Sequence, residues 1–257
     1  MTKLSLYFKT LPRTCCKRQF SNVAKSLDIP TISKVPQLYP NFVLPFQQSR
    51  EHPALKKLRT EQIEKHPQGR LSTAPDQTEF LCWLANSLQV QTVVEVGVFL
   101  GYTTLALALS LPENGRVIAL ERDEKHLEIA KQYWEMAGVQ SKIQLMIGDA
   151  MNSLVELCKS QQNKEIDLVY VDADNQPYEL YYEHSLKLLK QNGVIALDNI
   201  FMHGDILPNP PGSIHPPTKQ SASIHSIQNL TTKINVDKRV DLSLLSIGDG
   251  LLLCRKK

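Results

Sequence analysis

Residues 92–121 decide the fold class, and they read TVVEVGVFLGYTTLALALSLPENGRVIALE. The stretch begins with a β-branched apolar run at 92–97, continues with an Ala/Leu-rich run at 101–111, and ends with a second β-branched run at 116–121. Short apolar strands that alternate with helices of this length are typical of βαβ units in a buried parallel sheet. The stretch therefore predicts the first unit of an α/β domain.

The same alternation continues toward the C-terminus. Further strands are predicted at 142–147, 167–172 and 193–198, and helices at 123–137, 151–160 and 178–190. A loop with five prolines between 208 and 217 precedes a helix at 222–234, and two strands within 240–254 flank the turn sequence Ile-Gly-Asp-Gly at 247–250. This order predicts a parallel sheet that is covered on both faces and finished by an antiparallel hairpin.

Upstream of the first strand, helices are expected at 54–65 and 76–88, and the second places Phe80, Trp83, Leu84 and Leu88 on one face. Residues 28–53 contain five prolines without a regular period, which indicates an extended linker or strap. We therefore divide the chain into a basic extension at 1–27, this linker at 28–53, and the main domain at 54–257.

Charge is unevenly distributed along the chain of 257 residues. Residues 1–27 hold six lysines or arginines and no acid, whereas the remainder carries 23 basic and 26 acidic residues. The acid-free, Ser/Thr-bearing segment is typical of a mitochondrial transit peptide but also of a plain basic tail, so the location stays open between mitochondrion and cytoplasm. A nucleic-acid-binding function is disfavoured because such binding needs a basic face. No apolar run is long enough to predict a membrane span.

Acidic residues follow every predicted parallel strand. They are Glu95, Glu121, Asp149, the pair Asp172 and Asp174, and Asp198. Ligands of open α/β sheets bind beyond the carboxyl ends of the strands, so these side chains should meet at one site. The first strand lacks the GxGxxG of dinucleotide-binding enzymes and carries a carboxylate where a pyrophosphate would be repelled. A nicotinamide-dependent oxidoreductase is therefore disfavoured, and a nucleoside cofactor without a pyrophosphate is favoured.

Taken in order, EVGVFLGYTTLALALSLPENGRVIALE, GDA, YVDAD, ALDN and SIGDGLLLC resemble the cation-dependent class I O-methyltransferases, the caffeoyl-CoA and catechol O-methyltransferase relatives. The resemblance implies a Rossmann-like, seven-stranded, mostly parallel sheet and S-adenosylmethionine as the methyl donor. It also implies a small hydroxylated aromatic acceptor, and relatives of this family often form homodimers.

Matched to the family's motifs, nine residues would form the cofactor pocket: Thr73, Glu95, Gly97, Val98, Thr103, Glu121, Ala150, Asp174 and Tyr181. The resemblance places Glu121 at the ribose, Asp149 and Ala150 beside the adenine, and Asp174 at the methionine amino group. These roles are expectations that the resemblance supplies.

The family's divalent metal site corresponds here to Asp172, Asp198 and Asn199. Two carboxylates and an amide oxygen are hard ligands that suit Mg²⁺, Ca²⁺ or Mn²⁺. Two neighbouring hydroxyls of a catechol could chelate such an ion, which would lower a hydroxyl pKa and orient one oxygen.

The chain departs from the family where many relatives carry a base. Asn175 stands where a lysine commonly follows VDAD, and Asn cannot usefully accept a proton. We expect metal coordination through Asp172 to activate the acceptor, with His203 as a candidate helper or an idle loop residue. The alternative is a catalytically weak or inactive protein that keeps the fold as a cofactor-binding scaffold.

Overall fold

A computed structural model of the chain describes residues 39–160, 166–174, 178–206 and 222–257. Four of the sequence predictions therefore fall wholly or partly outside the described residues: the basic extension at 1–27, the first part of the linker at 28–38, the position of Asn175, and the Pro-rich loop at 208–217. The described chain divides by its contacts into residues up to Phe46 and a main unit from Gln47 to Lys257.

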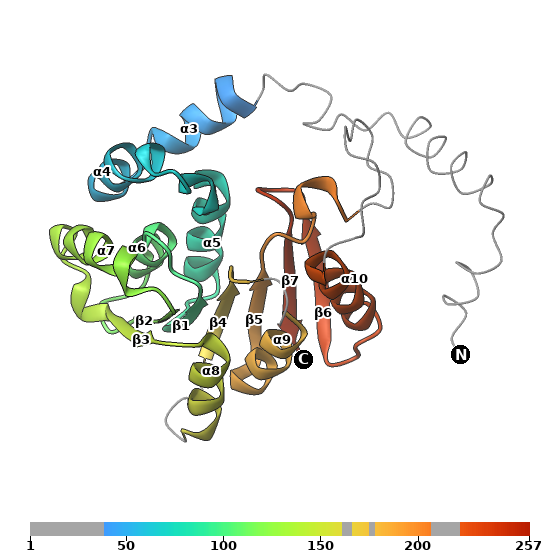
Figure 1. The fold of residues 1–257 in the computed structure, drawn as a ribbon. Helices are drawn as coiled ribbons and strands as arrows, with labels where there is room; N and C mark the ends of the chain where they lie inside the picture. Colours follow the sequence, from blue (N-terminus) through green and yellow to red (C-terminus); the bar gives the residue numbers. More distant parts are fainter. Residues whose placement is uncertain (1–38, 161–165, 175–177, 207–221) are drawn as a thin grey trace. The chain divides into compact units, whose positions relative to one another are not determined.

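The main unit is built on a seven-stranded sheet with the order β3-β2-β1-β4-β5-β7-β6 (Figure 1). The strands are β1 (Thr92–Val96), β2 (Arg116–Glu121), β3 (Ile143–Ile147), β4 (Ile166–Val171), β5 (Leu189–Leu197), β6 (Val240–Leu245) and β7 (Leu251–Lys256). The first five are paired in parallel, and β7 is antiparallel to both β5 and β6. The predicted fold class, a mostly parallel sheet closed by an antiparallel C-terminal hairpin, is confirmed.

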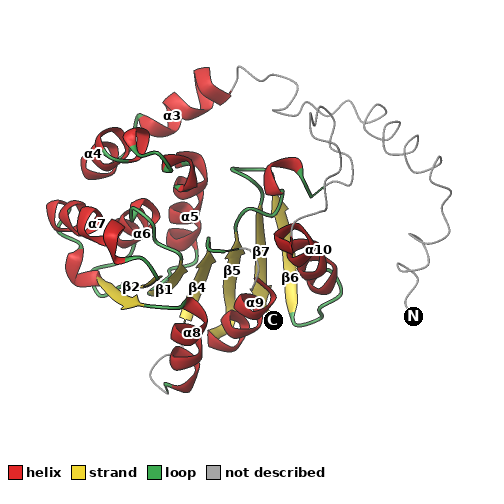
Figure 2. Ribbon diagram, viewed as in Figure 1, coloured by secondary structure: helices red, strands yellow, loops and turns green. Residues whose placement is uncertain are grey.

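Helices lie on both faces of this sheet (Figure 2). They are α4 (Pro53–Glu61), α5 (Pro75–Ser87), α6 (Tyr102–Ser110), α7 (Glu124–Met136), α8 (Ala150–Lys159), α9 (Tyr178–Leu188) and α10 (Ala222–Ile234). Successive strand residues point to opposite faces, so Val93 belongs to a core with residues of α4 to α7, and Val94 to a core with α8 to α10. Strands that are buried on both sides explain the continuous apolar runs in the sequence.

Short 3₁₀ turns connect several of these elements. They are Ile63–Lys65, Gly69–Leu71, Gln140–Lys142 and Met202–Gly204. Before α4, the chain forms a π-helical turn, Tyr39–Val43, and the short helix α3, Leu44–Gln48. Residues 39–48 are thus helical rather than extended, which differs from the expected linker. The prolines at 40 and 45 lie near the starts of these two turns, where a missing N–H is tolerated.

Two elements differ from the sequence prediction in packing or length. The predicted apolar face of α5 is only partly covered: Trp83 is 63% exposed and Leu88 43% exposed, whereas Phe80 and Leu84 are partly buried against the core. The fully buried apolar residues of the helix are Leu81 and Ala85. The buried face also contains Gln77, which is turned toward the ends of β4 and β5 by hydrogen bonds. Strand β5 begins at Leu189, four residues before the predicted start, and its register shifts beside β4.

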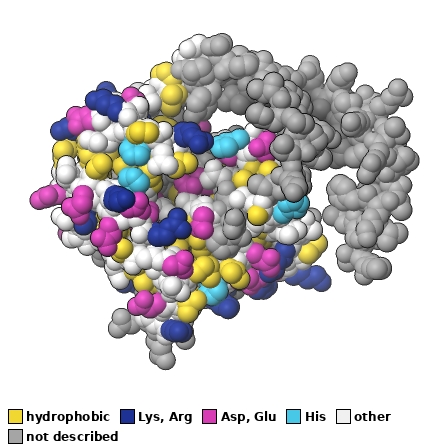
Figure 3. Space-filling view, viewed as in Figure 1, with side chains coloured by type: hydrophobic (Ala, Val, Ile, Leu, Met, Phe, Trp, Pro, Cys, Tyr) yellow, Lys and Arg dark blue, Asp and Glu magenta, His cyan; other side chains and the backbone are white. Residues whose placement is uncertain are grey.

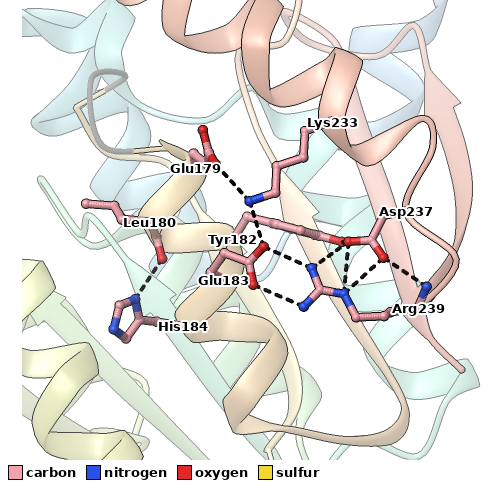
Figure 4. Close-up of polar contacts among 8 residues, drawn as sticks. All are labelled: Glu179, Leu180, Tyr182, Glu183, His184, Lys233, Asp237 and Arg239. Atoms are coloured by element: carbon pink, nitrogen blue, oxygen red, sulfur yellow. Dashed lines mark hydrogen bonds and ion pairs between the residues drawn. The ribbon is translucent and has the colours of Figure 1, made fainter. Parts of the chain in front are cut away.

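A surface ion-pair cluster joins α9, α10 and the turn before β6. It consists of Glu179, Glu183, Lys233, Asp237 and Arg239 (Figure 4). Acidic and basic side chains lie next to one another over this part of the surface (Figure 3). Within the described ranges, no helix is long and apolar enough to cross a membrane.

Candidate active site

The predicted site residues come together at the carboxyl ends of the parallel strands. One cavity of about 780 Å³ is lined by all thirteen of them: Thr73, Glu95, Gly97, Val98, Thr103, Glu121, Ala150, Asp172, Asp174, Tyr181, Asp198, Asn199 and His203. The cavity opens where β1 and β4 meet, between the half of the sheet that runs toward β3 and the half that runs toward β6. This is the switch point at which open α/β sheets bind ligands.

The turn between β1 and α6 approaches the neighbouring strand end closely. Gly97 has a φ of +91°, and a Cβ at this position would lie 2.0 Å from the carbonyl oxygen of Asp172. Only glycine tolerates this conformation and this approach. Glu121 holds the same turn, because its Oε2 accepts the backbone N–H groups of Val98 and Phe99 at 2.9 and 2.8 Å.

Glu121 therefore has a structural role, which is to hold this turn, in addition to its predicted ribose contact. Its other oxygen, Oε1, accepts the N–H groups of Arg122 and Asp123, both at 2.8 Å. A carboxylate offers about four lone-pair sites, and four backbone donors already use them. Ribose hydroxyls would have to share or replace some of these bonds.

Glu95 is a buried carboxylate at the floor of the cavity. It is 1% exposed, and the hydroxyl of Thr104 donates to its Oε2 at 2.6 Å. Burial raises the pKa of Glu95 to about 8, against the opposing effect of that hydrogen bond. A cation bound in the cavity would favour the ionised form.

Asp172, Asp198 and Asn199 lie together at the ends of β4 and β5. The side-chain amide of Asn199 donates to Asp172 Oδ1 at 2.9 Å, and the Asn199 backbone N–H donates to Asp198 Oδ1 at 2.6 Å. Burial raises the pKa of Asp172 to about 7, and the charge of Asp198 adds to that effect. Burial also raises the pKa of Asp198. Asp198 is 4% exposed and Asp172 is half-buried, and we call the two together the buried acid pair.

The loop after this pair is strained and is tied to the C-terminal hairpin. Asn199, Met202 and His203 all have positive φ, which is uncommon for residues other than glycine and clusters at functional sites. Both carboxylate oxygens of Asp249 accept the His203 backbone N–H at 2.9 Å. The His203 ring lies 3.3 Å from Asp249 and its side chain is 77% exposed.

Other predicted residues line the same cavity from the loop after β4 and from α8 and α9. Tyr181 donates from its hydroxyl to Asp174 Oδ1 at 2.7 Å, which ties α9 to the loop after β4. Asp149 caps α8 by accepting the N–H of Asn152 at 3.0 Å, and Ala150 begins that helix. Asp149 thus has the capping role that its position before a helix allows.

Charge in the cavity is strongly one-sided. Its described lining includes two arginines, Arg70 and Arg122, no lysine, and eight carboxylates: Glu95, Glu121, Asp123, Asp149, Asp172, Asp174, Asp198 and Asp249. Such a lining attracts cations and repels an unpaired anion. A sulfonium-bearing nucleoside and a divalent metal ion both fit this charge.

The sequence analysis missed several residues that complete the site. Gln77 lines the cavity from α5, and Tyr170 bonds to the buried acid pair from inside the sheet. Tyr170 could have been anticipated, because it precedes Asp172 by two residues and so shares its strand face. No sequence pattern indicates Gln77, because the apolar spacing of its helix predicts that a different side is buried.

The donor set around the buried acid pair fits a hard divalent ion in its chemistry. Two carboxylates lie there beside the side-chain amide of Asn199, whose nitrogen donates to Asp172. Neither carboxylate forms an ion pair with Arg70 or Arg122, the two arginines of the described lining. No group of three or more His, Cys, Asp or Glu side chains that could hold a metal ion occurs within the described part of the chain. A site at the acid pair would therefore depend on Asn199 and on solvent or substrate oxygens.

Three comparisons relate this geometry to known proteins. The family model described as O-methyltransferase matches residues 46–257. Catechol O-methyltransferase domain-containing protein 1 of Mus musculus is 36% identical over 207 residues, which cover 80% of this chain and 76% of that protein. Caffeoyl-CoA O-methyltransferase of Medicago sativa is 32% identical over 208 residues, covering 80% and 83%. The crystal structure of a Bacillus cereus O-methyltransferase in complex with SAH superposes with a TM-score of 0.72 at 25% identity, covering 84% of this chain and 97% of that chain.

Proposed function

The chain belongs to the O-methyltransferase family, and on that premise we propose that it transfers the methyl group of S-adenosylmethionine to a hydroxyl oxygen of a small, catechol- or caffeoyl-like aromatic molecule with the help of a divalent metal ion. The family match covers residues 46–257, and therefore the whole of the main unit that contains the cavity.

The observation that carries this proposal is the pairing of an acid-lined cofactor cavity with the buried acid pair. Asp172 is tied to the cofactor side of the cavity, because Thr73 donates to its Oδ2 at 3.2 Å and Thr103 donates to Thr73 at 2.8 Å. A buried carboxylate beside a half-buried one is unfavourable when both are ionised and no cation joins them. Their presence at the end of the cofactor cavity supports a site that is completed by a cation.

Methyl transfer from a sulfonium is an in-line displacement, so positioning is the main task of the protein. The acceptor oxygen attacks the methyl carbon, the carbon–sulfur bond breaks, and its electron pair remains on the neutral thioether. Holding two reactants in line can reduce the barrier by about 7–11 kcal/mol. The Gly97 turn would let the cofactor lie against the strand ends, and Asp172, Asp198 and Asn199 would fix the acceptor side.

The acceptor hydroxyl must also lose its proton. A divalent ion held by Asp172, Asp198 and Asn199 would lower the pKa of a bound hydroxyl. The described cavity lining contains no lysine, and His203 is the histidine on the acid-pair side. His203 is fixed by Asp249 and faces solvent, which suits a group that passes a proton outward.

A methyl-transfer assay tests the proposal. Full-length protein, S-adenosylmethionine and a panel of catechols, caffeoyl thioesters and flavonoids are incubated with Mg²⁺ or with EDTA, and S-adenosylhomocysteine is measured. We expect product with at least one acceptor in Mg²⁺ and a loss of at least about 100-fold in EDTA. Turnover that is indifferent to EDTA would overturn the metal dependence.

The second candidate is a methyltransferase fold that binds cofactor but turns over poorly, favoured by Asn175 at the position of the common lysine. Binding of S-adenosylhomocysteine without product from any acceptor would support it. The variant Asn175→Lys then separates the two: restored turnover with a changed pH profile would identify position 175 as the cause.

A further inference from the structure

Tyr170 places a buried hydroxyl beside both members of the acid pair. The residue lies on β4, is 0% exposed, and precedes Asp172 by two positions on the same strand face. Its hydroxyl donates to Asp198 Oδ2 at 2.6 Å and lies 3.4 Å from Asp172 Oδ2. One side chain from within the sheet therefore contacts both carboxylates.

Two further side chains hold this hydroxyl and the same carboxylate oxygens. Gln77 on α5 donates to Asp198 Oδ2 at 2.6 Å and to the Tyr170 oxygen at 3.2 Å. Thr73, in the loop before α5, lies 3.0 Å from the Tyr170 oxygen. The Tyr170 hydroxyl is thus the centre of a network from three separate segments.

The network occupies one side of the acid pair and leaves the other to Asn199. Every hydrogen bond that Tyr170, Gln77 or Thr73 makes to a carboxylate of the pair goes to an Oδ2 atom. Both bonds from Asn199 to the pair go to Oδ1 atoms. A donor on one oxygen fixes the rotation of a carboxylate and so the direction in which the other oxygen points. Outer partners of this kind orient metal ligands.

We propose that Tyr170, supported by Gln77, is a positioning residue that sets the buried acid pair for a divalent cation. This inference rests on the proposed function, since it assumes that the acid pair holds a metal ion. Without the hydroxyl, the two carboxylates lose the donor that they share and can rotate or move apart. The cation site is then less well formed, although all three predicted ligands remain.

The test is the affinity of the purified full-length protein for Mn²⁺, compared between the unaltered protein and Tyr170→Phe by titration calorimetry. We expect the dissociation constant for Mn²⁺ to rise at least about 10-fold in Tyr170→Phe, while the dissociation constant for S-adenosylhomocysteine changes by less than about 2-fold. That contrast distinguishes positioning of the acid pair from general damage to the cavity.

Tyr182→Phe is the matched control. Tyr182 is equally buried, and its hydroxyl also donates to a carboxylate at 2.9 Å, but this carboxylate is Asp237 in the turn before β6 (Figure 4). The Tyr182→Phe variant should therefore leave the Mn²⁺ affinity unchanged. Gln77→Met removes the other donor to Asp198 Oδ2 and should weaken Mn²⁺ binding in the same direction, so it decides the question if Tyr170→Phe does not fold.

Three outcomes are informative. Weaker Mn²⁺ binding in Tyr170→Phe, or in Gln77→Met where that variant decides, supports the inference. An unchanged Mn²⁺ affinity in the variant, with normal binding in the unaltered protein, overturns it and leaves the proposed function intact. No Mn²⁺ binding by the unaltered protein overturns the metal part of the proposed function, and this inference with it.

Discussion

Two carboxylate clusters in this molecule have opposite surroundings. The buried acid pair, Asp172 and Asp198, forms no ion pair with Arg70 or Arg122, the two arginines of the described cavity lining. In the surface ion-pair cluster, Arg239 contacts both Glu183 and Asp237, and Lys233 contacts Glu183 and Glu179 (Figure 4). The same residue type is thus compensated at the surface and left uncompensated at the cavity.

The pKa values follow this difference. Hydrogen bonds from Arg239 lower the pKa of Glu183 to about 2 and also lower that of Asp237. Burial raises the pKa of Asp172 to about 7 and that of Glu95 to about 8. The surface cluster therefore stabilises the fold in its ionised form, whereas the cavity acids are unfavourable when ionised unless a cation joins them. The ionised cavity acids therefore lower the stability of the ligand-free fold, and the same acids are the ones that the proposed reaction requires.

The largest effect on methyl transfer should come from removing one charge of the buried acid pair. We expect Asp198→Asn to lower kcat/KM for methyl transfer at least about 100-fold, because a metal ion contributes several kcal/mol to the transition state. The same substitution should abolish Mn²⁺ binding in calorimetry.

The matched control is Asp241→Asn, which removes a half-exposed carboxylate paired with Arg255 on the edge strand β6. Its turnover should equal that of the unaltered protein. Full activity in Asp198→Asn would show that the acid pair does not serve the reaction.

An intermediate effect, on the pH dependence of thermal stability, is expected when Glu95 is replaced in the ligand-free protein. The folded chain keeps the Glu95 proton up to about pH 8, while an unfolded Glu releases it near about 4.3. The folded state therefore binds more protons between these values, and its stability falls as the pH rises through them. Glu95→Gln lacks this loss, so its melting temperature should exceed that of the unaltered protein by at least about 3 °C at pH 8.

Thermal unfolding at a series of pH values measures this difference. The gap between Glu95→Gln and the unaltered protein should widen from pH 5 to pH 8. A gap that does not depend on pH, or that narrows as the pH rises, would contradict the buried, proton-retaining state of Glu95.

The smallest effect is expected in the surface ion-pair cluster. Exposed ion pairs contribute up to about 1 kcal/mol, so Glu183→Gln should lower the melting temperature by about 2–4 °C at pH 7. Its pKa is lowered in the folded state, so its contribution is present above about pH 4 and is lost as the pH falls toward about 2.

Circular dichroism melts at pH 7 and pH 3 test this prediction, with Mn²⁺ affinity as the internal control. The destabilisation should be smaller at pH 3, and the affinity should stay unchanged. A fall in Mn²⁺ affinity would mean that the two clusters are not independent.

The fold was predictable because its strands are buried on both faces. Continuous apolar runs at the positions of β1, β2 and β4 are only compatible with a sheet covered by helices, and the Gly-rich turn before β7 indicated the hairpin. The packing of α5 was less predictable: half of its predicted apolar face, Trp83 and Leu88, is exposed, and its buried face includes Gln77 and Thr78. Hydrophobic spacing indicates one apolar side of a helix but does not identify which side the rest of the chain covers.

The gathering of the thirteen predicted residues around one cavity was also anticipated, because acids that follow parallel strands must meet at the same edge. The contacts that orient these residues could not be predicted from the sequence. Gln77 and Asp249 come from a helix and a hairpin that are 121 and 51 residues away from Asp198 in sequence. Such partners are brought together only when the whole sheet is formed.

The sequence by itself determined the order of strands and helices and which carboxylates stand at the strand ends, since both follow from local apolar patterns. Only the tertiary structure decided the environment of each carboxylate. Burial and the distance to the nearest cation set a pKa, and both depend on segments that are remote in sequence. For this reason Glu183 and Asp172, acids of similar chemistry, have opposite charge preferences in the folded protein.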